Sequence, residues 1–192
     1  MITTIKSFMG HKHSKTEILE GALATAFADG LSELTFGRVA KRLGISDRVV
    51  VYYFPTKDDL VGEVLLELGL RLQTTLAPAF ATPAADHIDL ARKAWPILAH
   101  PDADPVFALF FEASGLAAIG RAPYRQLMPL IVQAWVDWST NLLSGPAPRR
   151  RTEAATSVAV IDGLLMFRHL AGPEMAEQAA RLLGVAGRRR RR

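Results

Sequence analysis

The stretch LTFGRVAKRLGISDRVVVYYFPTKDDL, residues 34–60, decides the fold. It predicts two short helices separated by a tight turn, followed by the start of a third helix. Gly44 supplies the backbone freedom that such a turn requires. Ser46 stands where a helix N-cap belongs, and Asp47 follows in the first turn, where a carboxylate suits the helix dipole. This is the layout of a helix-turn-helix.

The second helix of a helix-turn-helix enters the DNA major groove, and its N-terminal residues meet the base edges. Arg48 offers a bidentate fork to guanine, Val49 an apolar contact to a thymine methyl, and Asp47 an acceptor for cytosine. The following residues that suit phosphate contacts are Tyr52, Tyr53 and Lys57. The stretch therefore predicts a DNA-reading surface.

A strand is the alternative for residues 49–54, because three consecutive valines and two tyrosines favour β structure. The capped start at Ser46, the stop at Pro55 and the lack of a nearby partner strand favour a helix. Its weak intrinsic propensity means that packing, rather than local sequence, must hold this helix.

The same stretch resembles the DNA-binding signature of TetR/AcrR-type transcriptional regulators. The residues that carry the resemblance are Thr35, Ala40, Gly44, Ile45, Ser46, Tyr53, Phe54, Thr56, Lys57 and Leu60. The residues that fall where the family has its first-helix core and following turn are Ile18, Ala22, Phe27 and Gly30. The resemblance covers about the first third of the chain, and the remainder matches in length and helical layout.

The resemblance adds Thr35 and Arg38 to the candidate DNA contacts. Arg38 would substitute for an arginine that many members place at the position of Gly37. Arg48, Val49 and Val51 replace a common Gly, Thr and Tyr of the family. The resemblance therefore implies DNA binding but no particular operator sequence.

Composition places the chain among globular, helix-rich proteins. The 192 residues are 49% hydrophobic, and the mean hydropathy is +0.15. Without cysteine, the sequence excludes disulfides, thiolate metal sites and cysteine catalysis. We see no apolar run of the roughly 20 residues that a membrane span needs, and no signal pattern in residues 1–10. We expect a cytoplasmic protein with no membrane partner.

The basic character of the chain is local. The formal net charge of +4 includes five arginines at 188–192, so the remaining residues carry −1. Residues 1–57 hold eight Lys and Arg against five Asp and Glu, a modest excess beside the proposed DNA surface. His11 and His13 do not share a helix face, so we expect no metal site there. The arginine run either holds nucleic-acid phosphates or is a solvated tail, which is the default for such a block.

Helical periodicity and capping signals continue along the chain, and the predicted fold class is all-α. A capping box at residues 14–17 opens the first helix, and a long helix runs from residue 58 to about 80. A linker at 77–87 and a basic loop at 145–151 separate further helices at about 88–99, 104–119, 123–143, 152–170 and from 173 onward. We expect a flexible basic arm at 1–13, a helix-turn-helix head at 14–57, an effector-binding and dimerisation domain at 58–187, and a disordered tail at 188–192.

The middle helices are apolar on more than one face, which predicts either ordinary core packing or the wall of an internal cavity. In TetR-like proteins, helices in this part of the chain enclose an effector pocket. The candidate apolar lining residues are Trp95, Phe107, Phe110, Phe111, Met128, Trp135 and Met166. Glu112, Asp162 and His169 are the polar candidates for orienting a small hydrophobic effector, with a solvent-facing or core role as the alternative for each.

Residues 152–185 resemble the two terminal helices through which this family forms homodimers. Dimerisation also has a physical reason, because one short recognition helix reads too few base pairs for useful specificity. Two heads would address the half-sites of a palindromic double-stranded DNA operator, about 34–36 Å apart.

The predicted function is a sequence-specific, homodimeric transcriptional regulator, and the family tendency makes it a repressor released by its effector. The alternative is a small-molecule-binding helical protein with a degraded DNA-binding head, suggested by Gly37, Arg48 and Val51. Salt-sensitive, sequence-selective DNA binding separates the two. An enzyme is disfavoured, because we find no nucleophile–base pair, metal-ligand spacing or phosphate-cradling glycine loop. No cofactor is expected.

Overall fold

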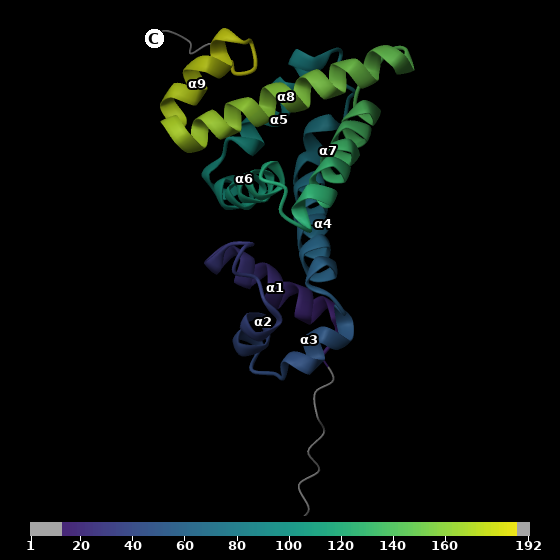
Figure 1. Ribbon diagram of the computed structural model, residues 1–192. Helices are drawn as coiled ribbons and strands as arrows, with labels where there is room; N and C mark the ends of the chain where they lie inside the picture. Colours follow the sequence, from purple (N-terminus) through teal and green to yellow (C-terminus); the bar gives the residue numbers. More distant parts are fainter. Residues whose placement is uncertain (1–12, 188–192) are drawn as a thin grey trace, which may run out of the picture.

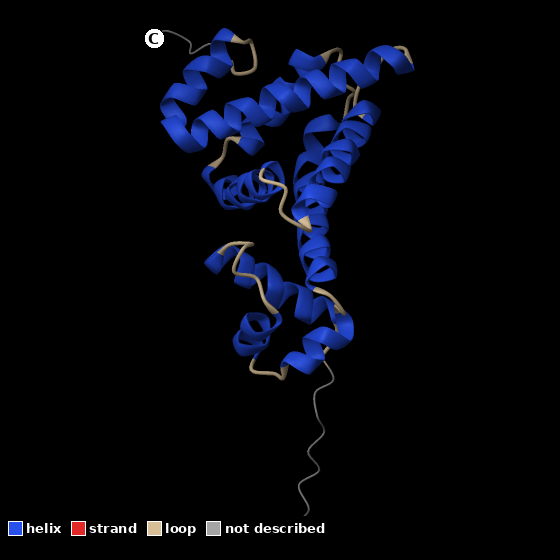
Figure 2. Ribbon diagram, viewed as in Figure 1, coloured by secondary structure: helices blue, strands red, loops and turns tan. Residues whose placement is uncertain are grey.

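The chain is helical throughout the part that the structure describes. The computed structural model describes residues 13–187, and within this range Figures 1 and 2 show helices and no strand. In chain order the helices are α1 (Lys15–Asp29), α2 (Phe36–Leu43), α3 (Asp47–Tyr53), α4 (Lys57–Leu76), α5 (His87–Leu98), α6 (Asp104–Ala118), α7 (Tyr124–Asn141), α8 (Ala147–Ala171) and α9 (Pro173–Leu182), with short 3-10 turns at Ala77–Phe80 and Pro101–Ala103. The all-α prediction is confirmed, including the helix at 47–53. The predicted arm, apart from His13, and the arginine tail lie outside the described residues.

Local capping sets the helix starts that the sequence predicts. The Ser14 hydroxyl accepts from the Glu17 amide (3.2 Å), while the Glu17 carboxylate accepts from the Ser14 amide (2.7 Å). Thr56 and Asp59 form the same reciprocal pair at the start of α4. Such boxes satisfy amide groups that have no partner within the helix.

The head, α1 to α3, shares its hydrophobic core with three helices beyond it. Ile18 of α1, Leu34 and Val50 of the head are fully buried, in one cluster with residues of α4, α6 and α7. The residues that the later helices contribute are Leu60, Val61, Val64, Leu65, Leu68, Leu109, Ala113, Tyr124 and Met128. In Figure 1 α4 rises from the head into the rest of the molecule, and α6 lies between the head and α8.

A second core holds the remaining helices together. It includes Trp95 of α5, Phe107 of α6, Val136 of α7 and Leu165 of α8. Helix α8 crosses this part of the molecule and contacts α5, α6, α7 and α9 (Figure 1). Phe110 of α6 packs against both cores, so α6 joins the head to the cavity region described below.

Two element boundaries differ from the sequence prediction. The predicted long helix ends at Leu76 rather than near residue 80, because the chain tightens into the 3-10 turn that contains Pro78. The predicted loop at 145–151 is wrong, since α8 begins at Ala147. Pro148 stands in the first turn, where proline's missing N–H costs nothing. The basic residues 149–151 are therefore helical.

Helix α8 also corrects the expectation that no apolar run is long enough for a membrane span. By length and composition alone it meets that requirement, with 18 residues of mean hydropathy of at least 1.2, and only 28% of that window is buried. A single helix of this kind is weak evidence for a membrane. Its incomplete burial instead marks α8 as a helix with an uncovered apolar face.

Close packing of α1 against α2 gives a test of the head. A Cβ placed on Gly21 would lie 2.7 Å from Cγ and Cδ1 of Leu43. Gly21→Ala should therefore lower the free energy of unfolding, because overpacking costs about 1–3 kcal/mol against the roughly 0.5–1 kcal/mol that alanine gains over glycine in a helix. The matched control is Gly115→Ala in α6, where nothing lies within 4 Å of the added carbon. Urea denaturation should show the control to be as stable as the parent or more so. Equal behaviour of the two variants would contradict this packing.

Candidate nucleic-acid interface and effector cavity

The turn between α2 and α3 is built from backbone caps. Thr35 is the N-cap of α2, and its hydroxyl accepts from the Arg38 amide (3.3 Å). Gly44 ends α2 in the left-handed conformation (φ 67°), which glycine adopts without steric penalty. The Ser46 hydroxyl accepts from the Arg48 amide (3.3 Å) and caps α3. These contacts fix the angle at which α3 leaves α2.

Helix α3 has an outer and an inner face. Val50 is fully buried, and Val49 and Tyr53 pack half-buried against the head core. Arg48 is exposed, and 77% of the Tyr52 side chain is exposed. The outer face therefore carries Arg48 and Tyr52 but not Val49. The hydroxyl of Tyr53 is engaged, because it donates to the His13 carbonyl (2.5 Å).

The predicted DNA contacts differ in how free their side chains are. Among residues 13–187, the side chains of Arg48 and Tyr52 form no hydrogen bond or ion pair. Arg38 instead pairs with Asp29 (3.3 Å) and Glu33 (2.5 Å) within the head. Lys57 is exposed and makes only a long contact, 3.5 Å, with the Ser32 carbonyl.

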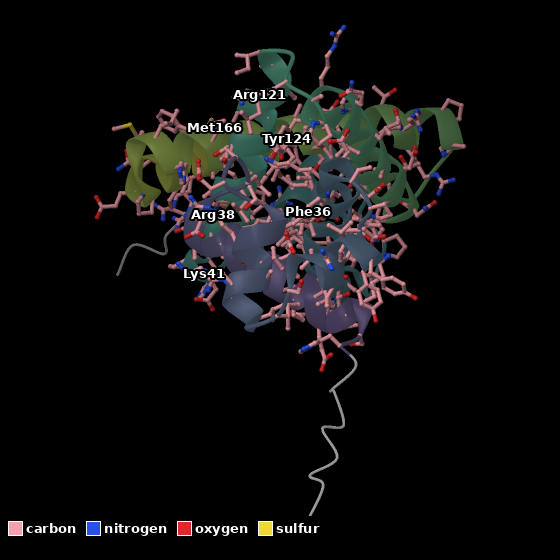
Figure 3. All side chains as sticks on the ribbon, turned by 60° about the horizontal axis from the view of Figure 1, so that its bottom comes forward. Phe36, Arg38, Lys41, Arg121, Tyr124 and Met166 are labelled. Atoms are coloured by element: carbon pink, nitrogen blue, oxygen red, sulfur yellow. The ribbon has the colours of Figure 1, made fainter. Side chains whose placement is uncertain are left out.

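Two exposed residues beside this face were not among the sequence-predicted contacts. Lys41 lies on α2, near Arg38 in the view of Figure 3, and its ammonium group has no partner within the described part of the chain. Val51 is exposed on α3, one turn after Arg48. Helical phase would have found both residues, because each lies three or four positions from another outer-face residue.

An apolar cavity of about 90 Å³ lies among α4, α5, α6, α7 and α8. The sequence-predicted pocket residues that line it are Phe107, Phe110, Met128, Trp135 and Asp162. Further aromatic lining comes from Phe80 and Trp138, and the rings of Trp135 and Trp138 meet edge-on with centroids 5.3 Å apart. A concave, largely apolar site with few polar groups is typical of small-molecule binding.

Other predicted pocket residues do not line this cavity. The indole of Trp95 is buried away from the cavity wall and donates to the Glu177 carboxylate (2.9 Å). Phe111 and His169 pack on each other between α6 and α8, with ring centroids 6.0 Å apart. Met166 is half-buried on α8 and does not line the cavity.

Asp162 is the one ionisable residue, within the described range, that lines this cavity. Its carboxylate has no hydrogen-bond or ion-pair partner among the described residues. Burial alone raises the pKa of Asp162 to about 6. No charged group on a neighbouring described helix contributes to this shift.

Glu112 on α6 holds the loop that follows α1. Its carboxylate accepts from the amide of Leu31 (2.8 Å) and from the amide (2.8 Å) and hydroxyl (2.7 Å) of Ser32. Beside it the hydroxyl of Tyr124 on α7 donates to the Leu31 carbonyl (3.0 Å). Burial acts to raise the pKa of Glu112, but the hydrogen bonds from Leu31 and Ser32 outweigh it and hold the pKa below its ordinary value. Glu112, predicted as an effector ligand, is in this structure a latch between α6 and the head.

Residues 18–64 match the family model described as bacterial regulatory proteins, tetR family. Over these residues the head is similar to TetR-type regulators. The match covers most of the head and the first turns of α4. It includes α2 and α3, whose exposed residues form the candidate DNA-reading surface. The TetR-type head thus supports DNA binding as the function of this surface.

Solved structures share the fold over most of the chain. A transcriptional regulator from Rhodococcus sp. Rha1 is 22% identical, with a TM-score of 0.69 over 90% of this chain and 94% of that one. The multidrug binding protein EbrR, complexed with imidazole, is 25% identical, with a TM-score of 0.66 over 95% and 97%. A TetR transcription regulator from Haloarcula marismortui is 18% identical, with a TM-score of 0.66 over 88% and 95%. No curated protein matches the sequence.

The latch predicts a local effect of Glu112→Ala. Hydrogen bonds to a charged acceptor contribute about 1.5–3 kcal/mol, so the variant should be less stable by an amount near this range at neutral pH. The amides of Leu31 and Ser32 should exchange faster with deuterium, measured by mass spectrometry. Because the Glu112 pKa is lowered, its contribution is present above its ordinary value of 4.5 and is lost as pH falls through the lowered value.

The control for the latch is Glu63→Ala, which breaks an exposed ion pair (2.6 Å) between α4 and Lys15 of α1. This variant should change stability little and leave exchange at Leu31 and Ser32 unaltered. Unchanged exchange at these two amides in Glu112→Ala would contradict the latch.

The half-buried, unpaired carboxylate of Asp162 predicts that Asp162→Asn stabilises the ligand-free protein. The folded state holds the Asp162 proton more tightly than the unfolded chain, so stability falls as pH rises from about 4 to about 6 and stays low above. The roughly two-unit shift sets an upper limit of about 3 kcal/mol for the gain at pH 7.5, and below pH 4 the two proteins should converge. Guanidinium denaturation at fixed protein concentration measures the difference.

Asp137→Asn is the matched control, because this exposed carboxylate pairs with Arg151 (2.5 Å). The Arg151 hydrogen bond lowers the Asp137 pKa, so its removal should slightly destabilise the protein above that pKa, the opposite sign to Asp162→Asn. A loss of stability in Asp162→Asn at pH 7.5 would show that the carboxylate has a partner.

Proposed function

We propose that the chain is a homodimeric repressor that reads a palindromic operator and releases it when a small hydrophobic effector enters the cavity. The observation that carries this proposal is the joint use of α4 and α6. Both helices pack into the head core, and both line the apolar cavity. A change in the cavity wall therefore acts on the same helices that position the reading surface. The head would comprise residues 14–57 and the effector and dimer domain 58–187, in a regulator that acts in the cytoplasm and carries out no catalysis.

Direct base reading falls to the exposed N-terminal part of α3. Arg48, with its unpaired guanidinium, offers a bidentate contact to guanine, and Asp47 at the helix start an acceptor for cytosine. Tyr52 and Lys41 flank this position and suit phosphate contacts, as does Lys57. Thr35, Arg38 and Tyr53 serve mainly to hold the head together in this arrangement, and Val51 replaces Val49 as the apolar contact.

The dimer interface we propose is the uncovered face of α8, extended by α9. Exposed residues recur on α8 every three or four positions, which places them on one face. They are Ala155, Ala159, Gly163, Phe167 and Leu170. Leu182, at the end of α9, is 91% exposed. A second copy related by a two-fold axis would cover both helices with the same pair of its own, since a two-fold interface is self-complementary.

Effector release runs from the cavity to the head through α6. Phe107 and Phe110 line the cavity, and Glu112 lies half a turn further along the same helix and holds Leu31 and Ser32. A ligand that displaces these phenyl rings shifts the helix that carries the latch. The similarity to EbrR, a multidrug binding protein complexed with imidazole, supports a small-molecule ligand for this fold.

The proposal is tested by selecting bound sequences from a random DNA pool at near-physiological salt. Recovery of a palindrome with half-sites about 34–36 Å apart is the expected result for two heads on one face of the duplex. A folded dimer that selects no motif would overturn the regulator function and leave the alternative, a small-molecule-binding protein with a degraded head.

Arg48→Ala tests the base-reading assignment. The variant should lose about 1–3 kcal/mol of operator affinity and relax the base preference at one position in each half-site. Lys41→Ala is the matched control, a phosphate contact whose loss should weaken binding to all sequences alike and reduce the salt slope by about one per head. Fluorescence anisotropy on the selected operator and its point variants measures both. Uniform loss in Arg48→Ala would exclude Arg48 as the base reader.

A further inference from the structure

The cavity wall combines aromatic rings with a single acidic group. Phe107, Phe110, Trp135 and Trp138 supply the rings, and Asp162 is the only ionisable side chain of the described residues that reaches the wall. The other polar lining side chain of note is the buried hydroxyl of Ser139. A ligand in this space therefore meets one negative charge in otherwise apolar surroundings.

An isolated carboxylate in such a place is costly unless a partner satisfies it. Two other acidic residues of this domain do have partners: Asp104 pairs with Arg168 (2.9 Å), and Glu177 accepts from Trp95 (2.9 Å) and pairs with Arg181 (2.9 Å). Asp162 has none among residues 13–187. A ligand with a positive charge would thus supply the partner that the Asp162 carboxylate lacks among the described residues.

We infer that the cavity selects a lipophilic organic cation, with a protonated amine that pairs with Asp162 and an aromatic or aliphatic body that packs against the rings. Aromatic faces attract cations, so both parts of the wall favour the same charge. An inorganic cation would lose its hydration among apolar side chains without replacement ligands. An anionic ligand would place like charges together. This ligand class rests on the proposed effector role of the cavity.

The size of the cavity limits the ligand. A volume of about 90 Å³ provides room for roughly six to nine waters, which corresponds to a single aromatic ring with a short chain. The amine would be fully charged at pH 7.5, because primary amines titrate near 10. Asp162 is also mostly ionised at this pH, since burial raises its pKa only to about 6.

The experiment uses three ligands of one skeleton and different charge: 4-phenylbutylamine, 4-phenylbutan-1-ol and 4-phenylbutanoate. Calorimetric titration of the full-length protein at pH 7.5 should give an affinity for the amine at least tenfold above that for the alcohol, with the carboxylate weakest. In Asp162→Asn the advantage of the amine over the alcohol should fall below about threefold. In Asp137→Asn, which alters an exposed carboxylate of α7, the full preference should persist.

The outcomes separate the ligand class from the effector cavity and from DNA binding. If the alcohol binds as tightly as the amine, or if the amine preference persists in Asp162→Asn, the inference of a cationic ligand is contradicted. The proposed effector role of the cavity is unaffected by either result. No binding of any of the three ligands overturns the cation and the effector role together. Operator binding, measured by anisotropy on the ligand-free protein, reports the head separately, so its loss would count against the regulator function alone.

Discussion

The hydrophobic core of the head includes apolar side chains from helices outside the head. Val50 of α3 and Ile18 of α1 are fully buried in one cluster to which α4, α6 and α7 also contribute. Separation of the head from these helices would expose that surface at about 25 cal/mol per Å². Protein interiors are also close-packed and transmit displacements rather than absorb them. A shift of α6 must therefore either move the head or open its core.

Local signals in the sequence account for what could be predicted of the fold. Capping residues at Ser14, Ser46 and Thr56, with glycine at the turn, fixed the helices of the head, and apolar spacing gave the rest. The predicted helix boundaries were wrong where one residue is compatible with both a loop and a helix. Pro148 indicates a loop by composition but is also favourable in the first turn of a helix, and only the packing of α8 onto α5 and α7 decides between them.

The sequence shows which site residues are bulky, apolar or acidic, but it does not show which groups they contact. Phe107, Phe110 and Trp135 are bulky and apolar in any fold. Which of their rings lines the cavity depends on how the five surrounding helices pack. Glu112 shows the limit most clearly. Its role comes from amide groups about eighty positions away in the sequence, and nothing near it in the chain points to them. Asp162 was found because an acidic residue among apolar neighbours is conspicuous, but only the structure shows that it lacks a partner among the described residues.

Helix α8 shows why composition cannot assign an environment. Its apolar length suits a membrane span, a protein core or a protein interface equally well. Its contacts separate these environments. One side packs on four helices and carries Arg168, paired with Asp104 of α6 in a two-pronged contact (2.9 and 3.1 Å) that a lipid environment would not supply. The opposite side carries small residues at Ala155, Ala159 and Gly163, which let another helix approach closely, and the exposed Phe167 and Leu170 near the end of the helix. A helix that is packed on one side and exposed on the other suits the proposed interface between two copies of the chain, and such an interface would lie beside the cavity wall, to which α8 contributes Val158, Ile161 and Asp162.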